Sequence, residues 1–489
     1  MRSLTDPFLP PKGNCFAKTT VTARATGNGG AEFAFVATGP ARAWFCTDRY
    51  IVATPQGVAT LSLSAWPVFG RRSHSVAWAP SSAADPALEA WYLASQGAKV
   101  LLLPGSVPQV LLSLLKTLLL FEPEITKKIP PGVRALNMDF LSRFAPIGPK
   151  PRKRDPLGVD VQVDVPDEWI HSGDFFGVFR PDGIDPMLAW GMGSTTGHTT
   201  VALRLPDGQG LHVCESQAKS DYWPVNGVQC TPYRQWVRQA AAAGYHVVWA
   251  PLSPEYRARF DEAKAVAFFE AAKGLDYGYR NLLWGWVDTL DSNYPCAPPD
   301  WGTTCLEWGF LEVAFGIVER LVPGVAHTLW GQAWNHRLGT FDRNLNTLQL
   351  YHEAVEGHGL QLAQLPTLVE QDGWTYNTTR NGAPERAESM VCCVFVCALW
   401  KAAGLFSEVG DEVNCTEFVN TDVYALAVFD APENRPDMCK RADPDNPVCQ
   451  LMGRYTLHLG PYYNSRPMTR HMAESCPSKP PLYHRPPGC

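Results

Sequence analysis

The sequence predicts an α+β protein whose central domain packs an antiparallel sheet on a cysteine-bearing helix. Three observations support this fold class. An N-terminal region alternates apolar and polar residues, as half-buried strands do. A later segment begins with glycine and histidine and continues as two strands joined by a turn. Further along, near residue 400, apolar residues recur every three or four positions, which is the period of a helix.

The first expected domain covers residues 1–147 and is rich in β-strand. Its predicted elements are strands at 31–38 and 58–64 and helices at 85–95 and 107–120. The prolines and the basic cluster that follow then indicate a linker over residues 148–165. A solvated linker is the simplest interpretation of that basic cluster; a nuclear signal or a cleavage site is the alternative.

The second expected domain covers residues 166–405. In it, His198 follows a run of glycine and small polar residues, which places it at the start of a strand and at an exposed loop edge. The next strand comes after the turn Pro206-Asp207-Gly208 and carries Glu215. Because the hairpin brings this carboxylate near the imidazole, Glu215 is the candidate that orients the ring.

The predicted helix near residue 400 places Cys392 in its first turn and Gly404 at its C-terminus. Backbone N–H groups of a first turn lack partners, so they lower the pKa of a thiol and favour the thiolate. Two other interpretations stay open, a buried core cysteine and a metal cluster with Cys393 and Cys397. The three cysteines lack the paired short spacing of ordinary zinc sites, so no metal is expected.

The order of these motifs resembles that of the circularly permuted NlpC-type papain-like hydrolases, which include the YiiX-like group. The matching segments are Gly173-Asp174 at a strand start, Gly197-His198, the acidic Glu215, a helical run from 255 to 273, Gly274 to Tyr279, and the Cys392 helix. In papain-like enzymes that are not permuted, the cysteine precedes the histidine. Here it follows the histidine, as a permutation predicts.

The resemblance implies a permuted papain-like domain and assigns roles to individual residues. It makes Cys392 the nucleophile, His198 the general base and Glu215 the polar residue that orients the base. It also makes Asp276, Tyr277 and Tyr279 candidate substrate-binding residues near the cysteine helix. The chain departs from the family in two ways. Cys393 stands where a serine is common, and an aromatic-rich insertion around residues 280–389 is expected to form a lid, a substrate platform or a surface for a protein partner.

A thiolate–imidazolium pair attacks a carbonyl carbon and forms a thioacyl-enzyme, which water or another acceptor resolves. We therefore expect a cysteine hydrolase that cleaves peptide or isopeptide-like amide bonds and needs no cofactor. The same three residues suit a lipid thioesterase or acyltransferase. A chain that keeps the fold without activity would be a structural or binding protein. The expected ligand is accordingly a peptide, an amide or an acyl compound.

Composition excludes two other classes of protein. A formal charge of −6 over 489 residues argues against a general nucleic-acid binder. The most apolar run, 100–121, is interrupted by Pro104, Gly105 and Pro108, so no transmembrane segment is expected. The N-terminus lacks the apolar stretch of a signal peptide, which means that the chain is not exported or that its numbering begins after processing.

Cysteine usage favours a secreted or endolysosomal protein. The chain has 14 cysteines, an even number. Five lie in the Cys/Pro-rich extension expected over 406–489 and are candidates for disulfides: Cys415, Cys439, Cys449, Cys476 and Cys489. Because five is odd, one is expected to be free or to pair with the body, for example with Cys397 or Cys305. Asn377 and Asn414 lie in sequons and are candidate glycosylation sites.

Overall fold

A computed structural model of the chain divides it into two compact units. The described residues are 14–26, 30–66, 71–79, 85–102, 115, 118–123, 128–144, 150–151, 163–192, 194–206, 208, 210–284, 308–409, 413–459 and 462–468. Of these, unit 1 combines 14–115 with 308–365, and unit 2 combines 118–284 with 366–468. Most of the helix predicted at 107–120 lies outside the described residues.

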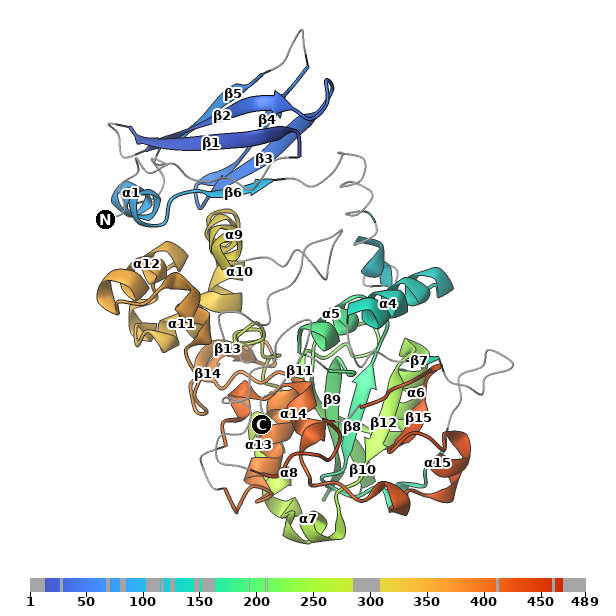
Figure 1. Cartoon of the computed structure of the whole chain (residues 1–489). Helices are drawn as coiled ribbons and strands as arrows, with labels where there is room; N and C mark the ends of the chain where they lie inside the picture. The colour runs from blue at the N-terminus through green and yellow to red at the C-terminus, as the bar shows by residue number, and fades with distance from the viewer. Residues whose placement is uncertain are drawn as a thin grey trace. The chain divides into compact units, whose positions relative to one another are not determined.

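Unit 1 contains a sandwich of two three-stranded antiparallel sheets (Figure 1). One sheet has the order β1 (Phe16–Ala25), β2 (Ala31–Ala41) and β5 (Ser73–Trp78), and the other has β4 (Gly57–Ser64), β3 (Thr47–Thr54) and β6 (Lys99–Leu102). Inward residues alternate along the strands, as Phe33 and Phe35 do in β2. They meet Tyr50 and Leu61 of the second sheet in one apolar core.

Helices from two distant parts of the chain complete unit 1. They are α1 (Pro86–Ser95), α9 (Trp308–Leu321), α10 (Pro323–Ala326), α11 (Gln332–Arg337) and α12 (Thr347–His352), with short turns η2 (His327–Gly331), η3 (Phe341–Arg343) and η4 (Glu353–Gly357). Asp85 caps α1 by accepting hydrogen bonds from the amides of Ala87 and Leu88. Helices α9 to α12 come from the segment expected to be an insertion in the second domain. The structure differs, because these residues form one unit with the N-terminal strands.

A buried ionic cluster fixes α9 within unit 1. Glu312 of α9 is 2% exposed. Its carboxylate accepts a hydrogen bond of 2.7 Å from the Tyr92 hydroxyl of α1 and forms an ion pair of 2.8 Å with Lys99 of β6. One carboxylate therefore joins three elements, and one of them lies more than 200 residues along the chain from the other two.

Unit 2 is organised around a six-stranded antiparallel sheet (Figure 1). Its strand order is β11 (Gly227–Pro232), β10 (Gly210–Gln217), β9 (His198–Leu205), β8 (Phe175–Phe179), β12 (His246–Ala250) and β15 (Cys449–Met452). The predicted α+β class and its antiparallel sheet are confirmed. The edge strand β15 comes from the expected C-terminal extension, whose described residues belong to this unit rather than to a separate tail.

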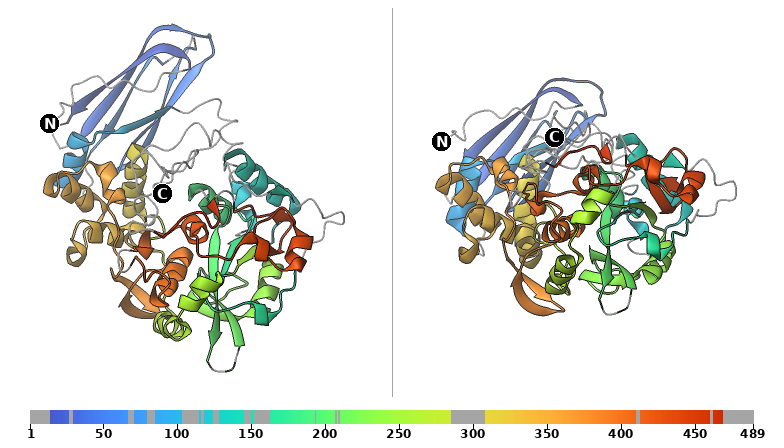
Figure 2. Two further views of the ribbon diagram at one scale, coloured as in Figure 1. Left: turned by 60° about the horizontal axis from the view of Figure 1, so that its bottom comes forward. Right: turned by 90° about the horizontal axis from the view of Figure 1, so that it is seen from below.

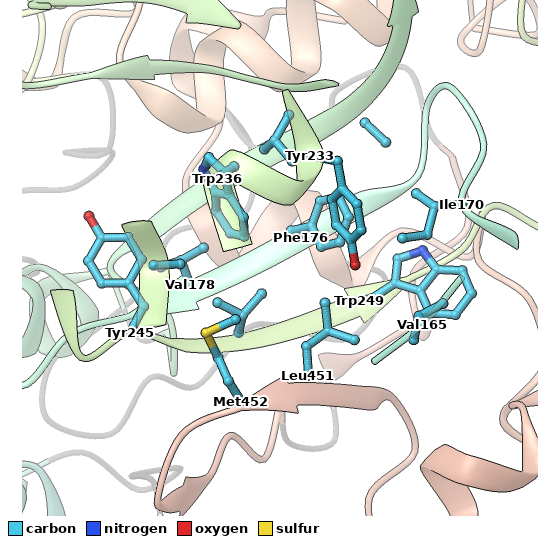
Figure 3. Close-up of a cluster of buried hydrophobic side chains, with 14 of the residues drawn as sticks. Val165, Ile170, Phe176, Val178, Tyr233, Trp236, Tyr245, Trp249, Leu451 and Met452 are labelled. Carbon is cyan, nitrogen blue, oxygen red and sulfur yellow. The ribbon is translucent and has the colours of Figure 1, made fainter. Parts of the chain in front are cut away.

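Helices cover both faces of this sheet, and β8 is therefore buried on both sides. Phe176 contacts Trp236 of α6 (Tyr233–Ala243), with 5.8 Å between the ring centres. Phe175, the residue directly before Phe176, contacts Trp400 of α13 (Cys392–Ala402), with 6.4 Å between the ring centres. Neighbouring residues of a strand point to opposite faces, so α6 and α13 pack on opposite sides. Figure 3 shows the apolar cluster on the α6 side.

The remaining elements of unit 2 are helices and short strands outside the six-stranded sheet. They are α4 (Pro131–Phe144), α5 (Ile184–Gly191), α7 (Pro254–Arg259), α8 (Glu262–Ala272), α14 (Asn420–Ala425), α15 (Asp437–Ala442), the hairpin β13 (Tyr376–Arg380) and β14 (Ala383–Ala387), and β7 (Lys150–Pro151) paired with β16 (Tyr455–Thr456). The helical run predicted at 255–273 is two helices, because Asp261 caps a new one. Figure 2 shows the C-terminal segment, in red, among the other elements of unit 2.

Four disulfides connect the described cysteines: Cys15–Cys46, Cys214–Cys230, Cys397–Cys415 and Cys439–Cys449. The prediction of disulfides is confirmed, and one of them joins the body at Cys397 to the C-terminal extension. Cys305, Cys476 and Cys489 lie outside the described residues. In the part of the chain that the structure describes, no helix is both long and apolar enough to cross a bilayer.

Candidate active site

Cys392 is the first residue of α13, as the sequence predicts. The helix ends where Gly404 takes a positive φ of 85°. The amide of Leu405 then donates to the Trp400 carbonyl at 3.0 Å, which closes the helix in the manner that favours glycine. Cys392 carries a free thiol and is 5% exposed. The first turn therefore presents a thiol at the end of the helix where backbone N–H groups are unpaired.

The hairpin β9–β10 brings His198 and Glu215 together. His198 Nε2 lies 2.7 Å from Glu215 Oε2. The other carboxylate oxygen accepts a hydrogen bond of 3.1 Å from the Trp236 indole, so Glu215 is held from both sides and is fully buried. The expectation of an exposed loop edge at His198 is wrong. The residue is 7% exposed and pairs with Val178 of β8, because β9 is an inner strand of the sheet.

His198 also interacts with Cys392, because each of the two groups shifts the pKa of the other. Since Nε2 faces Glu215, Nδ1 is the ring nitrogen left for the thiol. Burial lowers the pKa of His198, but hydrogen bonds and charge interactions with Cys392 and Glu215 raise it to about 10. These groups favour an imidazolium at neutral pH. A single imidazole thus contacts both a thiol and a carboxylate.

The two neighbouring thiols of α13 have opposite pKa shifts. The interaction with Cys393 lowers the pKa of Cys392, burial opposes this, and His198 lowers it further, so that the net pKa is well below the usual value. The hydrogen bond with Cys392, together with burial, raises the pKa of Cys393. The Cys393 thiol donates to the Phe418 carbonyl at 3.0 Å. Of the two thiols, Cys392 is therefore the one whose pKa is lowered.

Asn420, at the start of α14, is a site residue that sequence reasoning missed. Its Oδ1 lies 3.7 Å from Cys392 Sγ, and its Nδ2 donates to the Thr196 carbonyl at 2.9 Å. The side chain is fully buried and joins the nucleophile to the loop before the base. No local pattern in the sequence marks Asn420, because it reaches the site only through the fold.

Asp185, in α5, is a second residue that was missed. Gly197 permits its close approach to the base, because a Cβ at position 197 would lie 2.5 Å from Asp185 Cγ. The backbone amide of Arg180 donates to Asp185 at 2.9 Å. Burial raises the pKa of Asp185, as does the nearby Asp182, whereas the positive charge of His198 lowers it. A carboxyl group therefore lies directly beside the candidate base.

Two pockets flank Cys392 and His198. The larger one, of about 130 Å³, is bordered by His198 and by polar side chains such as Asp185 and Tyr245. The smaller one, of about 30 Å³, is bordered by Cys392 and mostly apolar residues such as Leu188 and Phe418. Tyr277, Gly197 and Leu188 border both. The histidine and the cysteine thus face different spaces, one polar and one apolar.

Tyr277 is the expected substrate-binding residue that reaches these pockets. Gly278 lets its segment approach the chain before Cys392, since a Cβ at position 278 would lie 2.3 Å from the Met390 carbonyl carbon. Burial raises the pKa of Tyr277 well above its usual value, and the charge of Cys392 adds to this effect. The phenol therefore stays protonated and can donate a hydrogen bond beside the nucleophile.

The other two expected substrate-binding residues are not part of either pocket lining. Asp276 forms an ion pair of 2.7 Å with Arg280 and accepts a hydrogen bond from Asn226. The Tyr279 hydroxyl donates to the same Asn226 side chain at 3.2 Å. Both residues thus hold the segment that carries Tyr277, which is a positioning role.

The two candidate glycosylation sites differ in accessibility. Asn377 is exposed on β13. Asn414 Oδ1 accepts hydrogen bonds from the Asp372 amide at 3.0 Å and the Thr416 hydroxyl at 2.8 Å, while its Nδ2 donates to the Glu370 carbonyl. A glycan on that nitrogen would displace the last contact, so of the two asparagines Asn377 is the accessible acceptor.

Unit 2 therefore combines a thiol, an imidazole and a carboxylate in one chain of contacts, with a pocket on each side. Among the residues described, no group of three or more His, Cys, Asp or Glu side chains is arranged to hold a metal ion. Comparison of the chain with protein-family models, curated proteins and solved structures gave no match.

Proposed function

We propose that the chain is a cysteine hydrolase with a permuted papain-like, NlpC-type domain that cleaves amide bonds through a thioacyl-enzyme. The observation that carries this proposal is the contact of His198 with both Cys392 and Glu215. The pKa of the thiol is lowered and that of the imidazole is raised, and together these shifts favour a thiolate–imidazolium pair. A merely structural cysteine in an apolar core would have a raised pKa instead.

In the first half of the reaction, the Cys392 thiolate attacks the carbonyl carbon of the amide, and the carbonyl oxygen takes up negative charge. We assign the stabilisation of that oxyanion to backbone N–H groups of the first turn of α13, and Tyr277, which lines the same pocket, would add a hydroxyl donor. His198 then gives its proton to the leaving nitrogen as the C–N bond breaks. Glu215 holds the ring and stabilises its positive charge throughout this step.

In the second half, a water molecule attacks the thioester carbon. His198, now neutral, accepts a proton from that water, and the thiolate leaves as the C–S bond breaks. The products are a carboxylic acid and an amine, and the thiolate–imidazolium pair is restored. Asn420 acts in both halves as a positioning residue, because it joins the nucleophile to the loop that precedes the base.

The pockets favour an amide substrate over a lipid. The space beside Cys392, where the acyl part would lie, is about 30 Å³ and holds a group the size of a methyl or a water molecule. A long acyl chain needs far more room than this. The space beside His198, where the leaving group would lie, is about 130 Å³, close to that of a cavity that accepts a benzene ring. Small acyl groups with a larger, polar leaving group are the expected substrates.

Alkylation by iodoacetamide, followed by mass spectrometry, tests the proposal without a known substrate. We expect Cys392 to be modified at pH 6 to 7 much faster than a free cysteine, and the rate at that pH to fall in His198→Ala. Cys393→Ser is the matched control and should remain reactive at Cys392. If Cys392 reacts only after unfolding, the hydrolase proposal fails, and the chain would instead be a binding or structural protein.

We further propose a secreted or endolysosomal location. Four disulfides distributed over both units fit a protein that folds in an oxidising compartment. Expression with and without a secretory leader, followed by thiol counting of the purified protein, checks this. Equal activity and full reduction of all described cysteines after cytosolic expression would contradict it.

A further inference from the structure

Three aromatic side chains are exposed together at one end of the sandwich in unit 1. Trp44 and Phe45, between β2 and β3, are 77% and 70% exposed, and Trp66, after β4, is 47% exposed. The rings of Phe45 and Trp66 lie 5.0 Å apart, edge to face. The amide of Ala65 donates to the Cys46 carbonyl at 3.0 Å, so the two connections are adjacent. Large apolar side chains are seldom gathered on a surface without a partner.

The scaffold beneath these side chains is well held. Cys46 forms a disulfide with Cys15, and the amide of Arg42 donates to the Cys15 carbonyl at 2.8 Å. The buried Asp48 carboxylate accepts hydrogen bonds from three successive amides, those of Asn14, Cys15 and Phe16. The rings are therefore presented outward by a fixed loop, and little conformational entropy remains to be lost when a partner binds.

Arginines surround the same aromatic side chains. Arg42, Arg71 and Arg72 are exposed, and segments 39–47 and 64–73 contain no acidic residue. The amide of Ser64 donates to the Arg71 carbonyl at 3.0 Å, which places Arg71 beside the connection that carries Trp66. Arg72 donates to the Gly39 carbonyl at 3.2 Å. The charged residues of these two segments are thus all basic, in a chain with a net charge of −6.

We propose that this aromatic–arginine tip, formed by Arg42, Trp44, Phe45, Trp66, Arg71 and Arg72, binds the surface of bilayers that contain anionic phospholipids. Tryptophan and phenylalanine partition into the headgroup region, and arginines pair with lipid phosphates. The tip would hold unit 1 to a membrane without crossing it.

Co-sedimentation of the full-length chain with vesicles tests this proposal. One set of vesicles is phosphatidylcholine alone, and the other contains roughly one-third phosphatidylserine. We expect clear binding to the anionic vesicles, weaker binding to the neutral ones, and loss of the difference at high salt, where charges are screened. No binding to anionic vesicles at low salt would overturn the proposal.

Variants separate the contribution of the aromatic side chains to vesicle binding from that of the arginines. Trp44→Ala combined with Phe45→Ala should lower binding to both kinds of vesicle by about tenfold or more. Arg42→Gln and Arg71→Gln should each lower binding to the anionic vesicles by about fivefold and leave the neutral ones unchanged. Trp169→Ala is the matched control, since that tryptophan is 43% exposed but lies in unit 2. Because all these side chains are exposed, the thermal unfolding midpoints should not change.

Other outcomes would replace the membrane with another partner. Binding to insoluble polysaccharide but not to vesicles, or self-association that Trp44→Ala abolishes, would overturn the proposal. So would equal vesicle binding by the parent chain and the aromatic variant. Cys392→Ala should bind vesicles like the parent chain, so failure of the hydrolase proposal and failure of this one are distinguishable.

Discussion

Each unit of this chain buries a small ionic cluster, and the two clusters differ in what their groups face. In unit 1, Glu312 is satisfied by the Tyr92 hydroxyl at 2.7 Å and by Lys99 at 2.8 Å. In unit 2, Glu215 is equally satisfied, but the imidazole that it holds continues to a thiol. That thiol and imidazole border two pockets.

The difference shows that a buried charge is not by itself a sign of chemistry. The cluster of unit 1 joins three elements, and its effect is on stability: burial raises the pKa of Tyr92 and the Glu312 carboxylate adds to that shift, so the phenol remains a donor. The cluster of unit 2 moves the pKa values of two groups in the directions that produce an ion pair. Ionisable groups with opposed shifts beside a pocket are typical of reactive sites.

The largest expected effect follows from removing the nucleophile or the base. Cys392→Ala and His198→Ala should each lower kcat/KM for a small acyl amide by at least about ten-thousandfold. Glu312→Gln should leave kcat/KM of the folded protein unchanged, because its cluster is in the other unit. Steady-state hydrolysis measures both. Activity within tenfold of the parent chain in Cys392→Ala would remove the contrast between the two clusters.

The second largest effect is on the stability of unit 1 and concerns the cluster around Glu312. Glu312→Gln leaves Lys99 without its ion-pair partner and should lower the free energy of unfolding of unit 1 by about 3–5 kcal/mol. Tyr92→Phe removes one hydrogen bond and should cost about 1–2 kcal/mol. Denaturant unfolding followed by a probe in unit 1 measures these values. A loss below about 1 kcal/mol for Glu312→Gln would mean that this cluster is not structural.

A smaller effect is expected at the residue that orients the base. Glu215→Gln removes a charge that raises the pKa of His198, so this pKa should fall below about 10. The imidazolium that protonates the leaving group would then be lost at lower pH, and the alkaline limb of the pH–rate profile should move down. The rate at neutral pH should fall roughly 10- to 100-fold. An unmoved alkaline limb would show that another group titrates there.

The raised pKa of His198 also makes the free energy of folding depend on pH. His198 has a folded pKa of about 10, above its ordinary value of 6.5, so its contribution to the free energy of folding is complete below pH 6.5. It is lost as the pH rises from there through about 10. In Glu215→Gln this loss should be smaller and end at lower pH, which unfolding measurements at a series of pH values can detect.

The smallest effect distinguishes the two neighbouring thiols. The interaction with Cys393 lowers the pKa of Cys392, so the thiolate is lost only as the pH falls well below the ordinary thiol value. Cys393→Ala removes that interaction and should move the acid limb of iodoacetamide reactivity to higher pH. Cys393→Ser keeps a donor and should leave the limb nearly in place. Identical profiles for the two variants would contradict the role of Cys393.

Local patterns were enough to predict the parts of the site that lie within single elements. Cys392 at a helix start, Gly404 at its end and the hairpin between His198 and Glu215 follow from residue periodicity and turn residues, which act over a few positions. The exposure of His198 was mispredicted because it depends on β8, a neighbouring strand that covers it. Local pattern does not show which strands flank a given strand.

Contacts between distant segments were the part that the sequence did not reveal. Asn420 and Asp185 reach the site through folding of the sheet, and neither has a local pattern of its own. Likewise, the apolar helix α9 could pack on any apolar surface, and its place in unit 1 depends on the partners of Glu312. The expected disulfides were confirmed as a class, whereas their pairing depends on the fold.

The position of β15 at the edge of the sheet has a consequence for biosynthesis. The chain is made from the N-terminus, and His198 precedes Cys392 by 194 residues (392 − 198). At typical ribosomal speeds, about 10 to 40 seconds separate the two. The strand that closes the sheet beside β12 emerges later still. A nascent chain therefore carries its base long before its nucleophile, and it completes its sheet only after the nucleophile has been made.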